Sequence, residues 1–191
     1  MRSLETNKSG LRKEKLTLRK NLSENERIEK SLSITDRLLG IPEFDKCKNV
    51  LIYASYNNEV ETDRVVLKAM LKGKNIYMPK VNGDEMEFYR VFSLDELAAG
   101  AFGIREPYDI EHLKYDGVPE TVCILPMAVF DNEGNRIGYG KGYYDKYLSR
   151  INVDYMIGLA FECQRSEVVI DTDKHDRKLH IAVTEANTYR F

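Results

Sequence analysis

A glycine-rich segment at residues 138–145 combines residue types that suit a phosphorylated ligand. Its sequence, Gly-Tyr-Gly-Lys-Gly-Tyr-Tyr-Asp, places flexible backbone, a cation, phenol rings and a carboxylate on one short loop. An apolar run precedes the segment and a helical pattern follows it, so its backbone N–H groups should lie at a helix N-terminus, where phosphate binds well. This mixture predicts a site for a polyphosphate and its metal ion beside a flat aromatic ligand.

The segment differs from the common phosphate loops. A Walker A loop, GxxxxGK[ST], would need glycine where Asn135 stands, and serine or threonine where Gly142 follows Lys141. The dinucleotide fingerprint GxGxxG has a different spacing from the GxGxG found here. A glycine-rich turn without a ligand is the alternative, but the neighbouring Arg136 and Asp145 favour a phosphate site.

This segment, with residues 125–131 before it, closely resembles the signature of the 5-formyltetrahydrofolate cyclo-ligase family, also called methenyltetrahydrofolate synthetases. The resemblance runs in order over nearly the whole chain. Its further parts are Lys8 with Arg12, and residues 59–62, 103–107, 157–162 and 175–176. It implies an ATP- and Mg²⁺-dependent conversion of 5-formyltetrahydrofolate to 5,10-methenyltetrahydrofolate, with release of ADP and phosphate.

The implied chemistry explains why no nucleophilic triad is needed. A formamide carbonyl is a poor electrophile, and its oxygen is a poor leaving group. Transfer of the γ-phosphoryl group to the formyl oxygen would remove both difficulties, and N10 of the folate would then close the ring. Because the nucleophile belongs to the substrate, the protein should act by positioning and charge stabilisation.

The resemblance also assigns roles to residues of this chain. The ATP-binding residues would be Lys8, Arg12, Arg136, Ile137, Gly138, Tyr139, Gly140, Lys141, Gly142, Tyr143 and Tyr144. The folate-binding residues would be Ala54, Glu59, Tyr139, Gly140, Lys141, Gly142 and Tyr143. The catalytic residues would be Lys141, Arg136 and Tyr143, and the Mg²⁺ ligands would be Asp145 and Asp176.

Lys8 and Arg12 are four residues apart and therefore share one helix face. Two such cations can hold phosphate oxygens. The alternative is a solvated basic face, which the pattern alone favours, because other cations surround them: Lys13, Lys15, Arg19 and Lys20. The family resemblance instead favours the phosphate contacts.

Glu59 lies before the first turn of a predicted helix and is free to meet a ligand, whereas Glu61 and Asp63 are explained by the helix N-terminus itself. A carboxylate suits the adjacent N–H donors of a reduced pterin. Tyr139 stands where some relatives carry arginine, so any phosphate contact made there would fall to Lys141 and Arg136. Tyrosines near a helix start more often simply pack.

The two candidate metal ligands have plainer alternatives. Asp145 suits the first turn of a helix, and Asp176 suits a turn. Mg²⁺ typically takes one or two carboxylates with water and substrate phosphates, which agrees with the pair. His175 and His180 are more simply polar surface residues than catalytic ones.

The elements that must position these residues alternate between helix and strand. Helices are predicted at residues 8–20, 23–39, 63–71 and 143–148, the second opened by a capping box of Ser23 and Glu26. Strands are predicted at residues 50–54, 75–78, 86–91, 122–125, 155–160 and 181–184, with the second ending at Pro79. Residues 99–115 read mostly as loop, with a helical turn near 94–97.

This order predicts one domain over residues 1–191, with an α/β fold: a mostly parallel twisted sheet flanked by helices in a three-layer sandwich. Residues 50–78 form a strand–helix–strand unit, which is typically a right-handed parallel crossover. By resemblance the arrangement is cyclo-ligase-like or sugar-phosphate-isomerase-like. Ligands of such sheets bind at the carboxyl ends of the strands, where Glu59 and the glycine-rich segment both fall.

Composition supports a soluble cytoplasmic protein. The 191 residues carry a net charge of −2, which disfavours a dedicated nucleic-acid binder. Cys47, Cys123 and Cys163 are widely spaced and read as reduced thiols. No apolar stretch reaches the roughly 20 residues of a membrane helix. We expect a monomer or weak dimer whose partners are 5-formyltetrahydrofolate and ATP, with no nucleic acid and no membrane.

Two other functions remain open on sequence grounds. One is a different enzyme on a similar frame, such as a sugar-phosphate isomerase or a CoA-transferase-like protein, which would need no ATP. The other is a non-catalytic folate- or nucleotide-binding sensor, which would bind its ligand without hydrolysing ATP.

Overall fold

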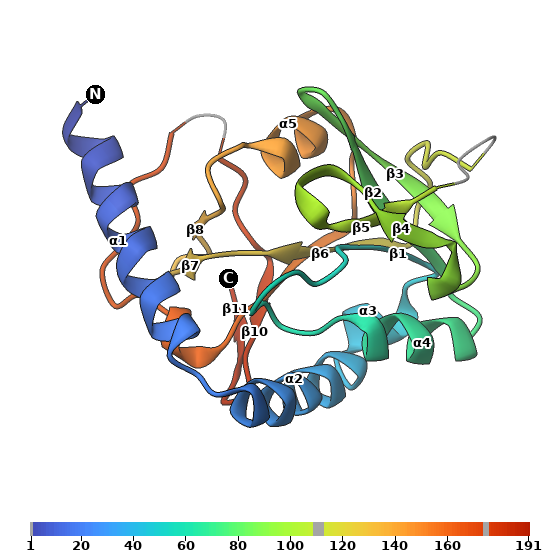
Figure 1. Cartoon of the computed structure of the whole chain (residues 1–191), viewed down its shortest axis with the longest axis horizontal. Coiled ribbons are helices and arrows are strands. Elements are labelled where there is room, and N and C mark those ends of the chain that lie inside the picture. Colours follow the sequence, from blue (N-terminus) through green and yellow to red (C-terminus); the bar gives the residue numbers. More distant parts are fainter. Residues whose placement is uncertain (1, 109–112, 174–175) are drawn as a thin grey trace.

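The computed structural model of this chain describes residues 2–108, 113–173 and 176–191, which are built around a seven-stranded sheet (Figure 1). The strand order is β11-β10-β9-β6-β1-β2-β3. The strands are β1 (Asn49–Ile52), β2 (Asn75–Asn82), β3 (Glu85–Val91), β6 (Thr121–Pro126), β9 (Tyr155–Leu159), β10 (Ile181–Val183) and β11 (Thr188–Arg190). The five inner strands run parallel, and β3 and β11 pair antiparallel at the two edges. The prediction of a mostly parallel sheet is confirmed.

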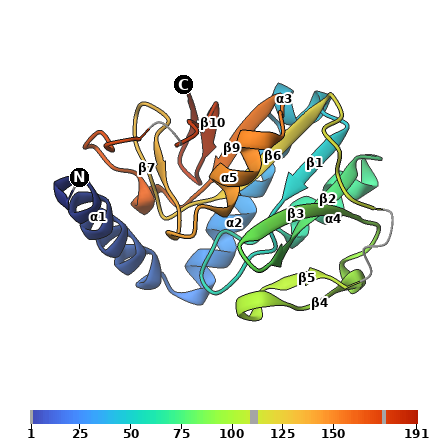
Figure 2. The ribbon, with the colours of Figure 1, turned by 90° about the horizontal axis from the view of Figure 1, so that it is seen from above.

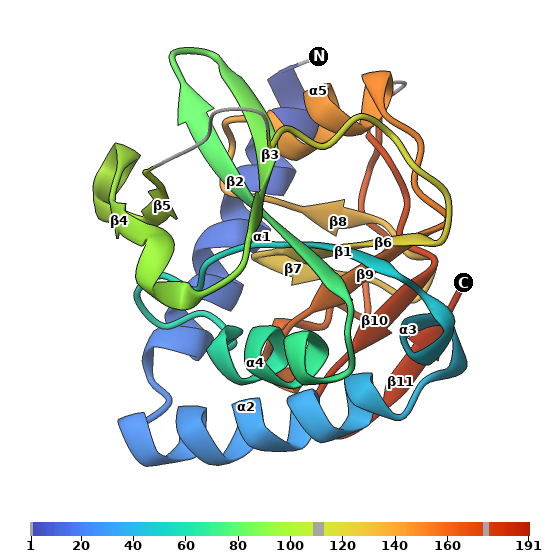
Figure 3. The same ribbon diagram turned by 90° about the vertical axis from the view of Figure 1, so that its right-hand side faces the viewer.

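The sheet is the middle of three layers. Val50 and Ile52 pack into the apolar cluster on one face, whereas Leu51 between them packs into the cluster on the other. Such alternation follows from the period of two in a strand. Three helices cover the first face, α2 (Glu24–Leu39), α3 (Pro42–Lys46) and α4 (Asp63–Leu71), and α5 (Tyr143–Arg150) lies on the opposite side (Figure 3). The three-layer prediction is therefore confirmed.

Strand β2 extends beyond the end predicted at Pro79. Its parallel pairing with β1 ends at Tyr77, and from there to Asn82 the strand pairs only with β3. Pro79 lies opposite Phe88 in that hairpin. Because β2 has no second neighbour at this point, the missing proline N–H breaks no bond to β1.

Residues 94–107 hold more structure than predicted. The expected helical turn is present as η1 (Leu94–Glu96), and it leads into a small hairpin of β4 (Leu97–Ala99) and β5 (Arg105–Pro107) around the turn η2 (Ala101–Gly103). The backbone N–H of Val81 donates to the Glu106 carboxylate at 3.2 Å, which ties the hairpin to β2. The hairpin lies beside β2 and β3 in Figures 2 and 3.

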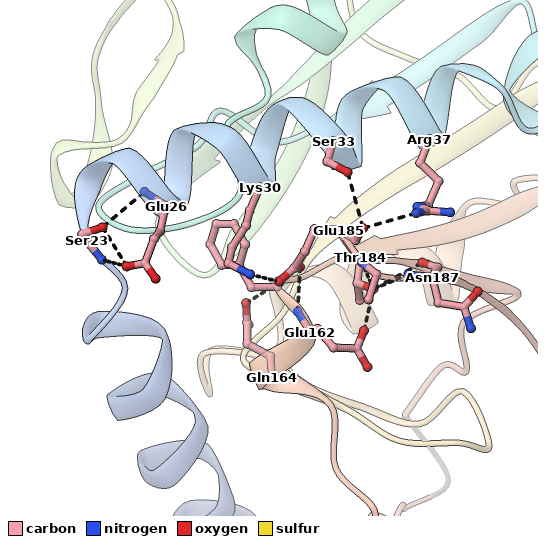
Figure 4. A network of polar contacts seen from close by, with 12 residues as sticks. Ser23, Glu26, Lys30, Ser33, Arg37, Glu162, Gln164, Thr184, Glu185 and Asn187 are labelled. Carbon is pink, nitrogen blue, oxygen red and sulfur yellow. Dashed lines mark hydrogen bonds and ion pairs between the residues drawn. The ribbon is translucent and has the colours of Figure 1, made fainter.

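Polar contacts fix helix α2 to the chain after β9 and β10 (Figure 4). The Ser23–Glu26 capping box opens the helix, as predicted. Lys30 donates to the Glu185 carboxylate, which also accepts from the backbone N–H of Glu162 at 2.9 Å. The Thr184 hydroxyl donates to the Glu162 carboxylate at 2.6 Å. These bonds join the helix, the end of β10 and the chain after β9.

Helix α1 (Arg2–Lys20) lies apart from the other helices, along one end of the sheet (Figures 1 and 2). Leu11 and Leu16 attach it by packing against a buried cluster that includes Ile137 and Ile170. This contact leaves its basic face next to the chain between β6 and α5. Within the described part of the chain, no helix combines the length and apolar character that crossing a membrane requires.

Candidate active site

The sheet has a topological switch point between β1 and β6. From β1 the chain passes to β2 on one side, and the later strand β6 lies on the other. Ligands of open α/β sheets bind in the crevice at the carboxyl ends of such strands. A cavity of about 400 Å³ lies there, and its wall includes Ala54 and Glu59 from the chain after β1, and Pro126 at the end of β6.

The loop after β1 is braced from within. The Thr62 hydroxyl donates to the carbonyl of Tyr53 at 2.8 Å and accepts from the backbone N–H of Ser55 at 3.1 Å. Although Thr62 stands at the N-cap of α4, its side chain makes no cap hydrogen bond. The Tyr53 hydroxyl donates to the Val60 carbonyl at 3.0 Å. These contacts hold the short loop that carries Glu59.

A hairpin separates β6 from the glycine-rich segment. Its strands are β7 (Val129–Phe130) and β8 (Arg136–Ile137), which the sequence analysis did not anticipate. Asp131 holds the turn: its carboxylate accepts from the backbone N–H of Asn135 at 2.9 Å and of Ile170 at 2.7 Å. Ile137 packs in the buried cluster beneath α1 and so has only its main chain to offer a nucleotide.

The glycine loop, residues 138–142, has backbone conformations that favour glycine. Gly140 has φ of 96°, and Gly142, the N-cap residue of α5, has φ of 67°. Residues other than glycine rarely adopt these backbone conformations. The loop therefore reaches the N-terminus of α5 with exposed main chain. The predicted strand–loop–helix order holds, with the hairpin inserted.

Helix α1 places Arg12 beside this loop and Lys8 beside Asp176. The Arg12 Nε donates to the Gly138 carbonyl at 2.8 Å, and a Cβ atom added at Gly140 would lie 3.8 Å from the Arg12 guanidinium. The Lys8 ammonium donates to the Asp176 carboxylate at 2.6 Å. The structure thus brings together residues that are far apart in the sequence. Their contact with ATP stays a prediction.

Lys141 and Arg136 are in opposite situations. Lys141 is exposed in the cavity wall, its ammonium lies 5.8 Å from the centre of the Phe102 ring, and it makes no hydrogen bond or ion pair to any described residue. Arg136 is buried, and its guanidinium donates to the Asp145 carboxylate at 2.8 Å and to the Arg177 carbonyl. In this arrangement the charge of Arg136 neutralises Asp145, so Lys141 is the better-placed cation for a phosphate.

Glu59 and Tyr139 form part of the opposite wall. The Glu59 carboxylate accepts from the backbone N–H of Tyr56 at 3.0 Å. Burial raises the pKa of Glu59, and the neighbouring Tyr139 hydroxyl opposes that rise. Arg19 in turn donates to the Tyr139 oxygen at 2.7 Å. A half-buried carboxylate at the cavity wall is suited to receive N–H donors from a ligand.

Aromatic and apolar side chains complete the cavity. The Tyr143 hydroxyl donates to the Gly83 carbonyl at 3.2 Å, which holds its ring at the mouth. Tyr144 meets Phe88 edge-on at 6.3 Å, and burial raises its pKa well above the ordinary value. Ala54, a predicted folate neighbour, is buried in the wall. The cavity thus has a polar end at the glycine loop and a flat, apolar body.

Comparisons with known proteins identify this arrangement. The model of the 5-formyltetrahydrofolate cyclo-ligase family matches residues 4–185. The chain belongs to this family. A probable 5-formyltetrahydrofolate cyclo-ligase of Schizosaccharomyces pombe is 34% identical over 180 residues, which cover 84% of this chain and 86% of that protein. The 5-formyltetrahydrofolate cyclo-ligase of Mus musculus is 32% identical over 186 residues, which cover 90% of each.

A solved structure agrees with this assignment. The NMR structure of the Aquifex aeolicus 5,10-methenyltetrahydrofolate synthetase superposes on this chain with a TM-score of 0.81 and 39% identity, covering 96% of this chain and 92% of that one. The resemblance drawn from the glycine segment is thereby confirmed, and so is the cyclo-ligase-like fold.

The two candidate Mg²⁺ ligands of this cyclo-ligase lie on neighbouring segments. Asp145 accepts through Oδ1 from Arg136 and, at 3.3 Å, from the backbone N–H of Arg177, which follows Asp176 directly. Within the described ranges no three histidine, cysteine or acidic residues gather as a metal cluster. Mg²⁺ usually binds one or two carboxylates and takes its other ligands from phosphate and water, so two carboxylates suffice here. The carboxylate pair is therefore chemically suited to the ion.

The two histidines differ in what can be said of them. His175 lies outside the described residues. His180 is exposed, and its Nδ1 accepts from the backbone N–H of Met156 at 2.9 Å. Burial lowers the pKa of His180, which agrees with a neutral ring that accepts this bond. His180 is thus a polar surface residue, as predicted, which also makes one hydrogen bond to the backbone of β9.

Sequence reasoning missed one charged residue of the site, and it placed that residue wrongly. Arg19 was grouped with the solvated face of α1, but only 6% of it is exposed, and it lines the cavity. A signal was present in the sequence. Lys8, Arg12 and Arg19 are separated by four and seven residues, the spacing of one continuous helix stripe.

Proposed function

We propose that this cyclo-ligase converts 5-formyltetrahydrofolate to 5,10-methenyltetrahydrofolate, with ATP converted to ADP and phosphate in a Mg²⁺-dependent reaction. The observation that carries the proposal is the single cavity that joins the glycine loop to Glu59. One ligand-sized space then touches both a phosphate-binding backbone and a carboxylate suited to a pterin. The names of the relatives support the same reaction.

The polar end of the cavity would hold the triphosphate. The main chain of residues 138–142 offers close approach, and Lys141 offers an ammonium that has no partner among the described residues. Arg12 lies at the edge of the same loop. A phosphoryl group in transfer carries negative charge on its outer oxygens, so cations fixed in this place lower the barrier by charge stabilisation.

The apolar body of the cavity would hold the folate. Glu59 would accept from the N–H donors at the pterin edge, and the Tyr143 ring and Ala54 would flank the flat ring system. Positioning is the main contribution that the protein makes here, because a bound formyl oxygen near the γ-phosphate turns a bimolecular step into an effectively unimolecular one.

The proposed steps balance without a protein nucleophile. The formyl oxygen attacks the γ-phosphorus, the bond to the bridging oxygen breaks, and ADP leaves with that electron pair. The lone pair of N10 then attacks the formyl carbon. The carbon–oxygen bond breaks, phosphate leaves with the oxygen, and N10 loses its proton. Lys141 stays close to the phosphate oxygens throughout, which stabilises charge in both steps.

Mg²⁺, when bound by Asp145 and Asp176, would neutralise phosphate charge and polarise the γ-phosphoryl group. In the structure the two carboxylates are held by Arg136 and Lys8. The second oxygen of Asp145, Oδ2, takes no part in its bonds to Arg136 and Arg177. This oxygen is the one that we expect to face the ion.

The test is the absorbance of the methenyl product. Purified protein is mixed with 5-formyltetrahydrofolate, Mg²⁺ and ATP, and matched samples omit ATP or replace Mg²⁺ with a chelator. We expect product only in the complete mixture. Product without ATP, or a phosphorylated sugar as the only ligand bound, would instead support an isomerase-like enzyme. Folate and ATP binding without product would support a non-catalytic sensor.

A further inference from the structure

Arg19, in the last turn of α1, is a buried cation in the wall of the proposed folate site. Only 6% of the residue is exposed. Among the described residues, four buried side-chain nitrogen or oxygen atoms lack a hydrogen-bond partner, and Nε of Arg19 is the only one from a residue of the cavity wall. Buried charges are normally fully paired. An incompletely paired guanidinium at this place therefore calls for a functional reason.

The contacts of Arg19 connect it through Tyr139 to Glu59. Its Nη1 donates to the Tyr139 oxygen at 2.7 Å, and its guanidinium carbon lies 5.6 Å from the centre of the Tyr139 ring. The Tyr139 phenol in turn neighbours the Glu59 carboxylate in the same cavity wall, and each of the two groups shifts the pKa of the other. These three residues, which come from α1, the glycine loop and the loop after β1, form a chain of cation, phenol and carboxylate along the cavity.

Arg19 makes no ion pair with any acidic residue in the described ranges. Its charge is therefore balanced through Tyr139, by Glu59. We infer that Arg19 is a positioning residue of the folate site: through the Tyr139 phenol it orients the Glu59 carboxylate and balances its charge. This inference rests on the proposed function, because Glu59 is taken to be the group that meets the pterin.

The groups around Glu59 determine in which direction its pKa moves when Arg19 is replaced. Burial raises the pKa of Glu59, and the neighbouring Tyr139 hydroxyl and the charge of Arg19 both act against the rise. The groups that face Glu59 are Arg19 on α1, Tyr53 after β1, Tyr139 in the glycine loop and Tyr144 on α5. The other charged residues that line the cavity are Arg136, Lys141, Asp145 and Glu106.

Burial raises the pKa of all three of these tyrosines, so they stay neutral below pH 10. Without the Arg19 charge, less remains to oppose the rise that burial causes in the pKa of Glu59. Glu59 would take up a proton at higher pH than in the wild type, and a protonated carboxyl turns one of its oxygens into an O–H donor, so it no longer matches two adjacent N–H donors of a pterin.

The experiment compares Arg19→Gln with Arg19→Lys. Gln keeps a hydrogen-bond donor for Tyr139 but lacks the charge, whereas Lys keeps the charge. The dissociation constant of 5-formyltetrahydrofolate is measured by calorimetry between pH 5 and pH 8, and that of ATP is measured in parallel. For Arg19→Gln we expect about tenfold weaker folate binding, which corresponds to about 1.4 kcal/mol, a loss of binding that begins at higher pH, and unchanged ATP affinity.

Arg19→Lys should restore the pH profile, which a merely structural role would not do. Lys20→Gln, one residue away and exposed, is the matched control and should behave like the wild type. If Arg19→Gln does not fold, Tyr139→Phe breaks the same chain with Arg19 in place and should move the profile in the same direction. Equal pH profiles for wild type, Arg19→Gln and Tyr139→Phe would overturn the inference.

Binding and turnover separate the two proposals. Wild-type protein that binds 5-formyltetrahydrofolate but forms no methenyl product would refute the proposed reaction and leave the calorimetric comparison of Arg19 variants in force. Wild-type protein that binds no 5-formyltetrahydrofolate would overturn both. Normal turnover in the wild type, with unaltered folate binding in Arg19→Gln, would overturn only the positioning role.

Discussion

Two polar clusters in this protein use similar residue types in different ways. In the cluster between α2 and β10, Glu185 accepts from Lys30 and from the backbone of Glu162, and Glu162 accepts from Thr184 and Tyr189 (Figure 4). That cluster pairs its carboxylates internally and borders no part of the cavity. Its unpaired Arg37 Nε likewise lies away from the cavity.

The cluster at the carboxyl ends of β1 and β6 is left incomplete. Lys141 has no ionic partner among the described residues, Arg19 has an unpaired nitrogen, and the half-buried carboxylate of Glu59 lines the cavity. The difference teaches how to separate a stabilising network from a binding site. Where polar groups satisfy one another they hold elements together, and where they remain open they await a ligand.

The largest expected effect comes from Lys141→Ala. Because the ammonium has no internal bond, the melting temperature should be unchanged, whereas turnover should fall by about 100-fold or more, the usual cost of losing one charge-stabilising group. The matched control is Lys146→Ala, an exposed cation of α5 outside the cavity wall. Methenyl absorbance gives the rates. Turnover of Lys141→Ala close to the wild-type value would remove Lys141 from the mechanism.

Glu59→Gln is expected to act on the folate alone. The KM for 5-formyltetrahydrofolate should rise about tenfold, because one acceptor of pterin N–H donors becomes a poorer match. The KM for ATP should stay unchanged. Initial rates at varied folate and fixed ATP measure this, with Glu61→Gln as the control outside the cavity wall. An unchanged folate KM together with an unchanged kcat would contradict the pterin-edge role.

Lys30→Met should show the reverse pattern in the other cluster. Loss of the bond to Glu185 should lower the free energy of unfolding by about 1 kcal/mol, because the pair is partly exposed and partly screened. For a chain of this size the melting temperature should fall by about 2–4 °C. Both KM values and kcat should match the wild type. A large change in kinetics, with stability intact, would erase the distinction between the clusters.

The sequence predicted the elements that local chemistry determines. Helix α4 spans the predicted residues 63–71, and α2 opens at the predicted capping box. Both depend on nearest neighbours along the chain. The strands β4, β5, β7 and β8 were missed because each is two or three residues long and exists through its pairing partner. β2 passes Pro79 because its pairing with β1 has already ended at Tyr77.

The site residues, like the secondary structure, could be predicted where they depend on neighbours along the chain and not where they depend on distant contacts. The glycine loop could be recognised because its residues are contiguous, and Glu59 because it lies just outside a helix start. The helix stripe shared with Lys8 and Arg12 could have singled out Arg19, but its contact with Tyr139, which is 120 residues away in the sequence, could not be predicted. The pairing of Arg136 with Asp145 likewise depends on how β8 and α5 meet in space.

The most direct test of the shared cavity follows one oxygen atom. Folate labelled with ¹⁸O in its formyl group is turned over with ATP and Mg²⁺, and the phosphate released is analysed by mass spectrometry. Direct phosphorylation requires the formyl oxygen and the γ-phosphorus to meet in one cavity, so we expect one ¹⁸O atom in each phosphate formed. Unlabelled phosphate, with the ¹⁸O recovered in water, would show that the two ligands do not react together there.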